Sequence, residues 1–369
     1  MDGRTRVLNA IRREPIDRIP RYDSFWEDTL TAWRDQGMGE TATPDELFDW
    51  DIVTMGIDAS MRMPQRVVAE DEAFVTYTDR AGYTVRKMKG KSRALEWIEH
   101  VTKDKDVWRE LRPRFAFDPE GEARVDTASY FAHMGPYPTW AEAKAQFDTL
   151  RATGKCVAFV VYGPWEATWR HRGYTELLMD VLTDPEWVTD MAAAQSDLVV
   201  ACLDHCVGLG MKPDAVFVVD DLASTRGPLF SPDTWRQVFK PMYACLGRFL
   251  DQHDVSFWLH CCGACETFFD DLIECSLDVV QPLQARAGLD VRVLKQRYGH
   301  ALTFWGNIDV TKLSGSAEEC EAEVREKILG AKDGGGYMYH SDHSIPPEVS
   351  FERYRWIMDL VNQYGGYEP

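Results

Sequence analysis

Short apolar segments alternate with longer amphipathic segments over the second half of this 369-residue chain. Each apolar segment has the length of a buried strand, and the residues after it repeat their apolar positions at helical spacing. Six strands are expected, at Cys156–Tyr162, Ala215–Asp220, Ser256–His260, Val279–Leu283, Leu302–Trp305 and Gly336–His340. The helices expected around them cover Asp184–Gly208, Ser231–Asp251, Glu266–Ser276, Asp290–Tyr298, Ala317–Leu329 and Glu348–Tyr364. This alternation is typical of a parallel sheet covered by helices.

Two further strands are expected before this repeat, one near Asp23–Trp26 and one at Asp51–Gly56. Eight strands in all predict an α/β fold of the (β/α)₈ TIM-barrel type. A doubly wound open sheet is the alternative, but the glycine-rich turn that such a fold carries after its first strand is missing. A basic amphipathic helix at residues 4–13 precedes the barrel.

The apolar period changes between residues 73 and 90. Phe74–Thr78 and Tyr83–Met88 both alternate, and they flank a short segment that contains Gly82. This pattern predicts a β-hairpin inserted into the barrel rather than a separate domain. We therefore expect a single domain over residues 1–369.

Composition narrows the classes of partner. The formal charge of −19 argues against nucleic acid or an anionic membrane as the main partner, because both need basic patches. No apolar run approaches the roughly 20 residues that span a bilayer, and the first residues lack a signal-peptide core. A cytoplasmic protein is expected.

Its nine cysteines, an odd number and unevenly spaced, indicate reduced thiols and metal ligands rather than disulfides.

The sharpest motif is His260-Cys261-Cys262-Gly263-Ala264-Cys265, at the end of an expected strand. Alternate residues leaving a strand point the same way, so His260 and Cys262 are expected to reach one ion while Cys261 faces the wall. Zinc takes Cys and His ligands, and catalytic zinc sites keep one position open. Spacing alone leaves two alternatives: a buried His beside apolar thiols, and a redox pair of Cys262 and Cys265.

Polar residues follow the other expected strands as well, and in a barrel these positions converge on one mouth. The acids Glu166, Asp220 and Asp221 each either act on a ligand or cap the helix that follows. His343 is the natural source of a further metal ligand, although a His in this Pro-containing loop more simply begins the final helix. The other residues expected at the mouth are Tyr162, Trp165, Trp258, Gln281, Gln284, Trp305, Asn307 and His340.

Taken in order, several short motifs resemble the uroporphyrinogen decarboxylase superfamily. They are Arg6-Val7-Leu8-Asn9-Ala10-Ile11, Asp17-Arg18-Ile19-Pro20, Tyr162-Gly163-Pro164, Val219-Asp220-Asp221, Leu259-His260-Cys261-Cys262-Gly263, Thr303-Phe304-Trp305-Gly306 and Ser344-Ile345-Pro346-Pro347. The resemblance covers essentially the whole chain. It implies a (β/α)₈ barrel, in agreement with the separate count of strands.

The resemblance favours one branch of that superfamily. True uroporphyrinogen decarboxylases hold substrate carboxylates with an Arg-Gln-Ala-Gly-Arg type segment, where this chain reads Arg21-Tyr22-Asp23-Ser24-Phe25-Trp26. The other branch contains zinc methyltransferases that work with a corrinoid protein and use a His-X-Cys pair plus a later Cys. His260 and Cys262 match the pair, but His343 stands where the later Cys would fall. The third ligand implied is His343 or a nearby acid.

The resemblance implies zinc and a corrinoid (cobalamin) carried on a partner protein. A site with fewer thiolates is a harder Lewis acid, which suits polarising an ether oxygen so that its methyl group leaves to the corrinoid. O-demethylation of a methoxylated aromatic is therefore expected. The implied metal ligands are His260, Cys262 and His343; the implied catalytic residues are Glu166, Asp220, Asp221 and Asn307; the implied substrate contacts are Tyr162, Trp165, Trp258, Gln284, Trp305 and His340.

Two other functions stay open. A metal-independent decarboxylase or lyase acting on a small acid would need cationic clamps at the mouth, and Arg170 and Arg226 are the main candidates. A non-catalytic binding subunit would bind no metal, and changing His260 would then alter no turnover.

Overall fold

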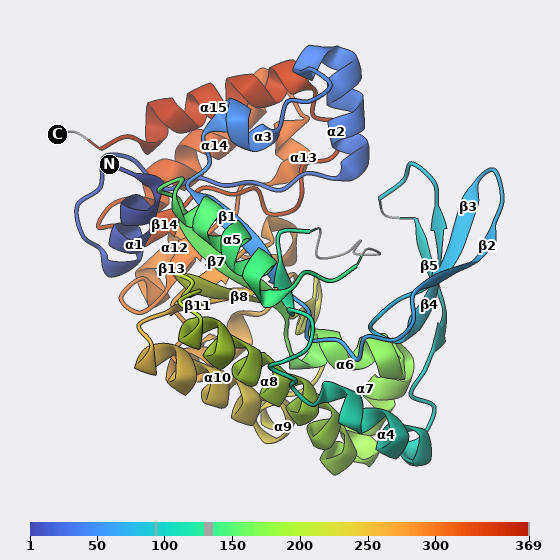
Figure 1. The fold of residues 1–369 in the computed structure, drawn as a ribbon. Coiled ribbons are helices and arrows are strands. Elements are labelled where there is room, and N and C mark those ends of the chain that lie inside the picture. Colours follow the sequence, from blue (N-terminus) through green and yellow to red (C-terminus); the bar gives the residue numbers. More distant parts are fainter. Residues whose placement is uncertain (93, 129–135, 368–369) are drawn as a thin grey trace.

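The centre of the structure is a curled sheet of seven parallel strands (Figure 1). The computed structural model describes residues 1–92, 94–128 and 136–367. The strands lie in the order β14 (Tyr337–Met338), β13 (Thr303–Trp305), β12 (Val279–Gln281), β11 (Ser256–His260), β8 (Ala215–Val219), β7 (Cys156–Tyr162) and β1 (Ile52–Ile57). A short antiparallel strand, β6 (Val125–Asp126), extends the β1 edge. The six strands expected in the second half are confirmed, although β12, β13 and β14 are shorter than expected.

The ladder does not close into a continuous barrel. The prediction of a strand at Asp23–Trp26 is wrong. This part of the chain makes only isolated β-bridges, from Arg21 to Tyr339 and from Phe25 to Ile345. The N–H of Tyr339 donates to the carbonyl of Pro20 over 2.8 Å, while the carbonyl of Arg21 accepts from the N–H of Asp51 over 3.0 Å. Pro20 has no N–H, which prevents a regular ladder along this segment. The fold is thus TIM-barrel-like, with its eighth position held by a few bridging contacts.

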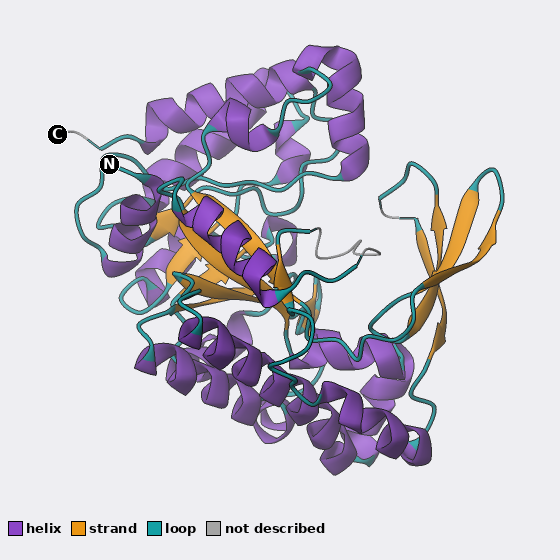
Figure 2. Ribbon diagram, in the orientation of Figure 1, coloured by secondary structure: helices purple, strands orange, loops and turns teal. Residues whose placement is uncertain are grey.

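Alternate strand residues fill the interior of the sheet, and helices cover its outer face (Figure 2). Trp258 and Trp305 lie inside and are completely or almost completely buried. The N-terminal helix α1 (Gly3–Arg12) contributes Val7 to the same interior cluster. The outer helices of the repeat are α5 (Trp140–Arg151), α8 (Pro185–Gly208), α10 (Lys240–Gln252), α12 (Val291–Tyr298), α14 (Ala317–Ala331) and α15 (Phe351–Gly365).

Two expected helices are interrupted. The segment expected as one helix at Ser231–Asp251 forms α9 (Pro232–Val238) and α10, because Pro241 has no N–H for a continuous helix. The segment expected at Glu266–Ser276 begins as a 3₁₀ turn, η3 (Glu266–Phe268), before α11 (Phe269–Glu274).

Two helices that follow β7 were not expected. They are α6 (Pro164–Arg172) and α7 (Tyr174–Thr183), which are separated by Gly173 with φ of 103°. The remaining elements are α2 (Glu27–Trp33), η1 (Arg34–Met38), α3 (Pro44–Phe48), α4 (Lys105–Leu111), η2 (Arg112–Phe115), η4 (Ala285–Ala287), α13 (Val310–Leu313), β9 (Ala223–Ser224) and β10 (Gly227–Pro228). Within the described ranges, no helix combines the length and apolar character needed to cross a membrane.

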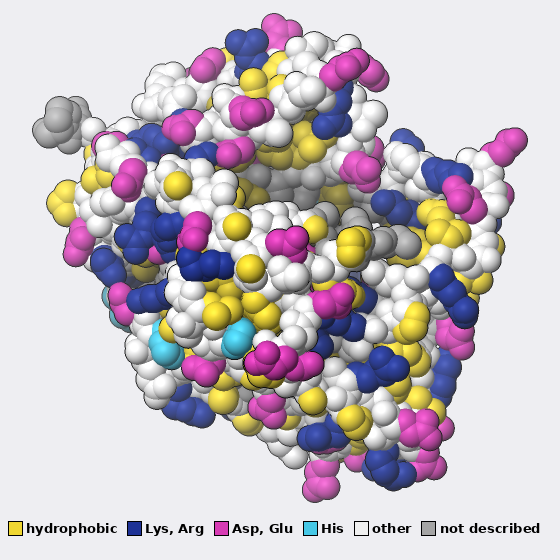
Figure 3. Space-filling view, in the orientation of Figure 1, with side chains coloured by type: hydrophobic (Ala, Val, Ile, Leu, Met, Phe, Trp, Pro, Cys, Tyr) yellow, Lys and Arg dark blue, Asp and Glu magenta, His cyan; other side chains and the backbone are white. Residues whose placement is uncertain are grey.

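The expected hairpin at residues 73–90 is the middle of a larger element. β3 (Phe74–Thr78) and β4 (Tyr83–Met88) pair as expected, but β2 (Arg66–Glu70) and β5 (Leu95–His100) extend them into a four-stranded antiparallel sheet. This sheet projects from the body of the protein (Figure 1), and apolar side chains lie on its surface (Figure 3). The outer strands were not predicted. All residues of β2 and nearly all residues of β5 are exposed, so their sequences show no alternation between buried and exposed positions.

Candidate metal and active site

The carboxyl ends of the parallel strands present one layer of polar side chains at the mouth of the sheet. Tyr162 ends β7, His260 ends β11 and Gln281 ends β12. His260 and Gln281 are direct partners in the parallel register. Residues in register point to the same face of a sheet, so these side chains meet inside the mouth. His340 follows β14 and joins them from the far edge.

Asp221, His260 and Cys262 bring three different donor atoms together. Their ligand atoms all lie within 4.8 Å of one another. Cys262 Sγ lies 3.5 Å from His260 Nε2, and that nitrogen lies 3.6 Å from Asp221 Oδ1. All three side chains are partly exposed, so the site can be reached from the mouth. Among the described residues, this is the group of His, Cys, Asp and Glu side chains whose spacing suits a metal ion.

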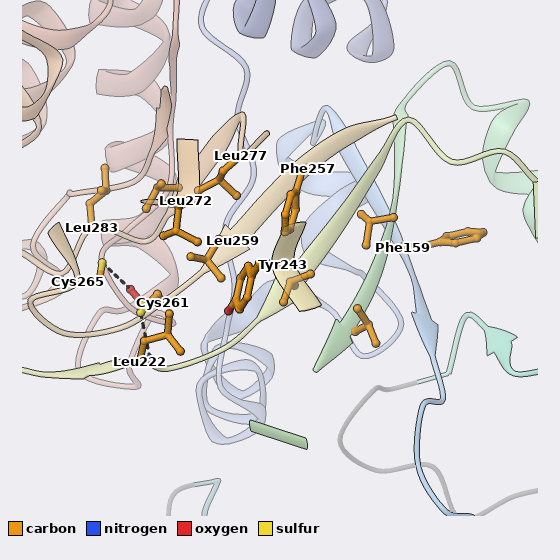
Figure 4. Close-up of a cluster of buried hydrophobic side chains, with 14 of the residues drawn as sticks. Phe159, Leu222, Tyr243, Phe257, Leu259, Cys261, Cys265, Leu272, Leu277 and Leu283 are labelled. Carbon is orange, nitrogen blue, oxygen red and sulfur yellow. Dashed lines mark hydrogen bonds between the residues drawn. The ribbon is translucent and has the colours of Figure 1, made fainter. Parts of the chain in front are cut away.

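The turn after β11 separates the roles of two adjacent cysteines. Cys261 faces the hydrophobic core, where its Sγ accepts the N–H of Leu222 over 3.3 Å (Figure 4). Cys262 faces the mouth, and its N–H donates to Asp221 Oδ1 over 2.8 Å. This confirms the alternation expected from the sequence. It also ties the backbone of one ligand residue to the side chain of another.

Gly263 lets the turn approach its neighbour closely. Its φ is +86°, and a Cβ on it would lie 2.6 Å from the backbone of Ala223. Its N–H donates to Gln284 Oε1 over 2.9 Å. Gln284, predicted as a substrate contact, therefore holds the turn that carries Cys262.

A chain of polar contacts orients His260. Its Nδ1 lies 2.5 Å from Gln281 Oε1, and Gln281 Nε2 lies 3.3 Å from His340 Nε2. His340 Nδ1 in turn contacts the carbonyl of Ser341 at 2.5 Å and Asp23 Oδ1 at 3.5 Å. Because an amide oxygen only accepts hydrogen bonds, Nδ1 of His260 carries the proton and Nε2 presents its lone pair to the triad.

Burial perturbs the acids and the thiol around this centre. Burial raises the pKa of Glu166 to about 7, with Arg170 opposing the shift and Asp221 adding to it. Burial likewise raises the pKa of Asp220 to about 8. The pKa of the Cys262 thiol is raised well above its usual range by partial burial and by the charge of Asp221. A bound cation would therefore favour loss of protons at these groups, because it would compensate their negative charge.

Asp220 acts as the anchor of helix α6. It accepts the N–H of Glu166 over 2.7 Å and the hydroxyl of Tyr243 over 2.6 Å. Gly163 passes so close that a Cβ there would lie 2.4 Å from Asp220 Cγ. Asp220 thus caps the helix that carries Glu166, whereas the sequence offered it as a cap for the helix that follows it, which Ser231 caps instead.

His343 is not brought into the triad. Its ring instead packs on Trp26, with centroids 5.5 Å apart. Asp221, predicted as a catalytic acid, takes the third place among the candidate ligands.

Four other predicted site residues lie away from the open mouth. Trp165 is buried among Phe230 and Phe239. Trp258 and Trp305 fill the barrel interior below His260. Asn307 is buried, and its amide nitrogen donates to the carbonyls of Leu283 and Leu289.

Sequence reasoning missed two partners of the predicted residues. Gln281 was placed at the mouth but not recognised as the partner of His260; its position in register was the available signal. Arg170 was named only as a clamp for a decarboxylase, because helix α6 was not predicted. It ion-pairs with Glu166, with Nη2 and Oε2 3.0 Å apart, one turn along that helix.

The uroporphyrinogen decarboxylase (URO-D) family model matches residues 149–364. The chain belongs to the uroporphyrinogen decarboxylase family. Relatives include the uroporphyrinogen decarboxylases of Actinobacillus pleuropneumoniae serotype 5b, 28% identical over 21% of this chain and 22% of the relative, and Actinobacillus succinogenes, 24% identical over 52% and 53%. These matches thus span from about a fifth to about half of the relatives' lengths. A methyltransferase from Methanosarcina mazei shares the fold, with a TM-score of 0.64 at 14% identity over 99% of both chains.

Proposed function

We propose that this family member is a zinc-dependent methyltransferase that moves a methyl group between a small substrate and a corrinoid carried on a partner protein. The observation that carries the proposal is the meeting of one nitrogen, one sulfur and one oxygen donor at the mouth, from His260, Cys262 and Asp221. Uroporphyrinogen decarboxylation needs no such set. The fold shared with a methyltransferase is consistent with this assignment.

The donor set fits zinc in two respects. Imidazole, thiolate and carboxylate are all zinc ligands, and three protein ligands leave a fourth position for substrate. Second, Gln281 holds Nδ1 of His260 by a hydrogen bond, so Nε2 is left to bind the metal. Metal-binding histidines commonly have such a hydrogen-bond partner on their other ring nitrogen. His343, the third ligand expected from the sequence, lies on Trp26 instead, so we assign the third position to Asp221.

We further propose that the substrate is a methoxylated aromatic and that the reaction is O-demethylation. Bound zinc would supply Lewis acidity toward the ether oxygen, and a carboxylate in place of a thiolate makes the site harder. The bond between methyl carbon and oxygen breaks with its electron pair left on oxygen. A reduced corrinoid on the partner protein would accept the methyl group and would supply the electron pair for the new bond.

Glu166 is placed to handle the proton that this reaction needs. Its carboxyl pairs with Arg170 over 3.0 Å, and the charge of Asp221 acts on it from the candidate metal centre. With its pKa raised to about 7, it is partly protonated near neutral pH and can give a proton to the departing phenolate oxygen. Asp220 contributes by capping α6 and so positioning Glu166.

Decarboxylation of a small acid is the second candidate, since the curated relatives are named as decarboxylases. The segment that begins at Arg21 gives the decarboxylase candidate little support. The guanidinium of Arg21 pairs with Asp49 and contacts Asn362, and both of these residues are exposed.

The test is methyl transfer to a reduced corrinoid protein, measured by the absorbance of methylcorrinoid with guaiacol-like donors. Transfer that needs zinc and is lost in His260→Ala and Cys262→Ala is expected. Release of carbon dioxide from an acid substrate, unaffected by chelator and by these variants, would instead establish the decarboxylase. No methylcorrinoid from methoxy, methylamine or methylthio donors would refute the proposal.

A further inference from the structure

A pocket opens at the carboxyl ends of β1 and β7, and none of the three candidate metal ligands lines it. Its hollow, including the part that is open to solvent, amounts to about 590 Å³. Its walls are the chain after β1, the end of β7, helix α6 and the turn between β3 and β4. The projecting four-stranded sheet therefore completes this pocket through its own turn. Nothing in the proposed chemistry above uses it.

Arg170 is a buried cation on the wall of this pocket. It is 8% exposed, and Nη2 pairs with Glu166 over 3.0 Å. Its Nε and Nη1 have no hydrogen-bond partner among the described residues. The guanidinium lies 3.8 Å from the ring centroid of Tyr162 and 4.4 Å from that of Trp169. These rings cover the faces of the guanidinium, which leaves its edges for hydrogen bonds.

His171 adds a second unpartnered atom to the same wall. It is 2% exposed, and its Nδ1 contacts the hydroxyl of Thr102 at 2.9 Å. Its Nε2 has no hydrogen-bond partner within the part of the chain that the structure describes. Buried polar atoms of this kind are nearly always satisfied in native proteins. Their clustering around one pocket indicates a polar ligand.

The charges around the pocket favour an anion. Burial alone would lower the pKa of Arg170, but Tyr162 and Glu166 raise it above its ordinary value, so the guanidinium stays charged. Asp58, a carboxylate of the lining, is paired with two cations: it lies 2.7 Å from Arg62 Nε and 3.5 Å from Arg80 Nε. Burial raises the pKa of Asp79, which also lines the pocket.

We propose that Arg170 binds the carboxylate of a small aromatic substrate in this pocket. A planar guanidinium with free N–H edges suits a carboxylate. Tyr83, Tyr162, Phe115 and Met61 supply apolar lining for an aromatic ring. Glu166 connects this pocket to the candidate metal centre, since it pairs with Arg170 and the charge of Asp221 acts on its carboxyl. The assignment of this pocket as the substrate subsite rests on the proposed function; the anion site itself does not.

The test compares benzoate with benzamide, its neutral isostere, by calorimetry on the intact protein. Both ligands are titrated into zinc-loaded and chelator-treated protein, so that a carboxylate bound to the metal is recognised by its loss with zinc. Benzoate binding at least tenfold tighter than benzamide in both forms is expected. Equal affinities, no binding of either ligand, or benzoate binding that disappears with the metal would overturn the proposal.

Two variants locate the site. Arg170→Met should abolish the preference for benzoate. Arg172→Met is the matched control: it removes the same charge from the same helix, but Arg172 pairs with Asp180 over 2.6 Å and does not line the pocket. If Arg170→Met still preferred benzoate to benzamide, Arg170 would not be the residue that binds the carboxylate.

A third variant covers the case in which Arg170→Met fails to fold. Ala167→Leu keeps the charge and fills the pocket from α6, so it should weaken benzoate at least tenfold. Unchanged benzoate binding in that variant would place the anion elsewhere and refute the proposal. A protein that prefers benzoate yet transfers no methyl group would refute the proposed function while leaving the anion site in place.

Discussion

His260 Nδ1 lies 2.5 Å from Gln281 Oε1, so the opposite nitrogen of the ring faces Asp221 and Cys262. The two residues are register partners on adjacent parallel strands, β11 and β12. The orientation of the candidate ligand is therefore set by strand pairing rather than by a flexible loop. Sites carried on strands are held more precisely than sites on loops.

Removing the Gln281 amide should weaken metal binding without unfolding the protein. We expect Gln281→Met to lower zinc affinity by about 10- to 100-fold, as losses of outer hydrogen-bond partners commonly do. Competition with a chromophoric chelator measures the change. Gln195→Met is the matched control, since Gln195 is equally buried but donates to the carbonyl of Tyr162. Equal zinc affinity in wild type and Gln281→Met would show that the amide does not orient His260.

Gly163 tests the packing of α6 against Asp220. Its φ is −73°, so alanine is compatible with the backbone, but the new Cβ would lie 2.4 Å from Asp220 Cγ. Asp220 is also held by Tyr243, so it cannot move without losing that hydrogen bond. We expect Gly163→Ala to destabilise the protein by about 2 kcal/mol, a typical cost of overpacking, as measured by urea unfolding.

Gly208→Ala provides the comparison for that experiment. Gly208 ends α8, and a Cβ there meets nothing within 4 Å. Its substitution should be neutral or stabilising by about 0.5 kcal/mol. Similar stabilities for Gly163→Ala and Gly208→Ala would mean that the contact with Asp220 relaxes freely.

His171 should make stability depend on pH in acid. Burial, with the charges of His100 and Arg172, lowers its pKa to about 3 from an ordinary value near 6.5. The unfolded chain therefore binds a proton on this side chain between about pH 6.5 and 3, where the folded protein does not. Stability falls as pH falls through this window, by about 1.4 kcal/mol per pH unit from this group.

The variant His171→Asn isolates that contribution, because it keeps a polar atom near Thr102 and removes the titrating ring. Unfolding by urea at pH 6.5 and pH 4.5 should show the wild type losing about 2 kcal/mol more than the variant over this interval. Parallel pH profiles for the two proteins would show that His171 is protonated in the folded state.

The part of the fold that the sequence predicted is the part where apolar periodicity reports burial. Strands β7, β8 and β11 are buried along most of their lengths and were bounded to within one residue. β2 and the closing segment near Arg21 have no such pattern: the first is exposed, and the second makes only isolated bridges. The interruption after α9 depends on Pro241, which acts through a missing hydrogen bond rather than through hydrophobicity.

The candidate site was predicted where chemistry and strand position coincide. His260 and Cys262 stand two residues apart at a strand end, and the structure brings them together. The choice between His343 and Asp221 depended on the path of a loop across the mouth, which spacing does not encode. The place of Arg170 on the pocket wall was not predicted, because it depends on helix α6, which was not predicted either.

Zinc content measured by plasma mass spectrometry tests the central claim most directly, using wild type beside His260→Ala, Cys262→Ala, Asp221→Ala and His343→Ala. The account predicts about one zinc per chain in the wild type and in His343→Ala, and loss in the other three variants. No zinc in protein purified without chelator, or loss in His343→Ala with retention in Asp221→Ala, would contradict it.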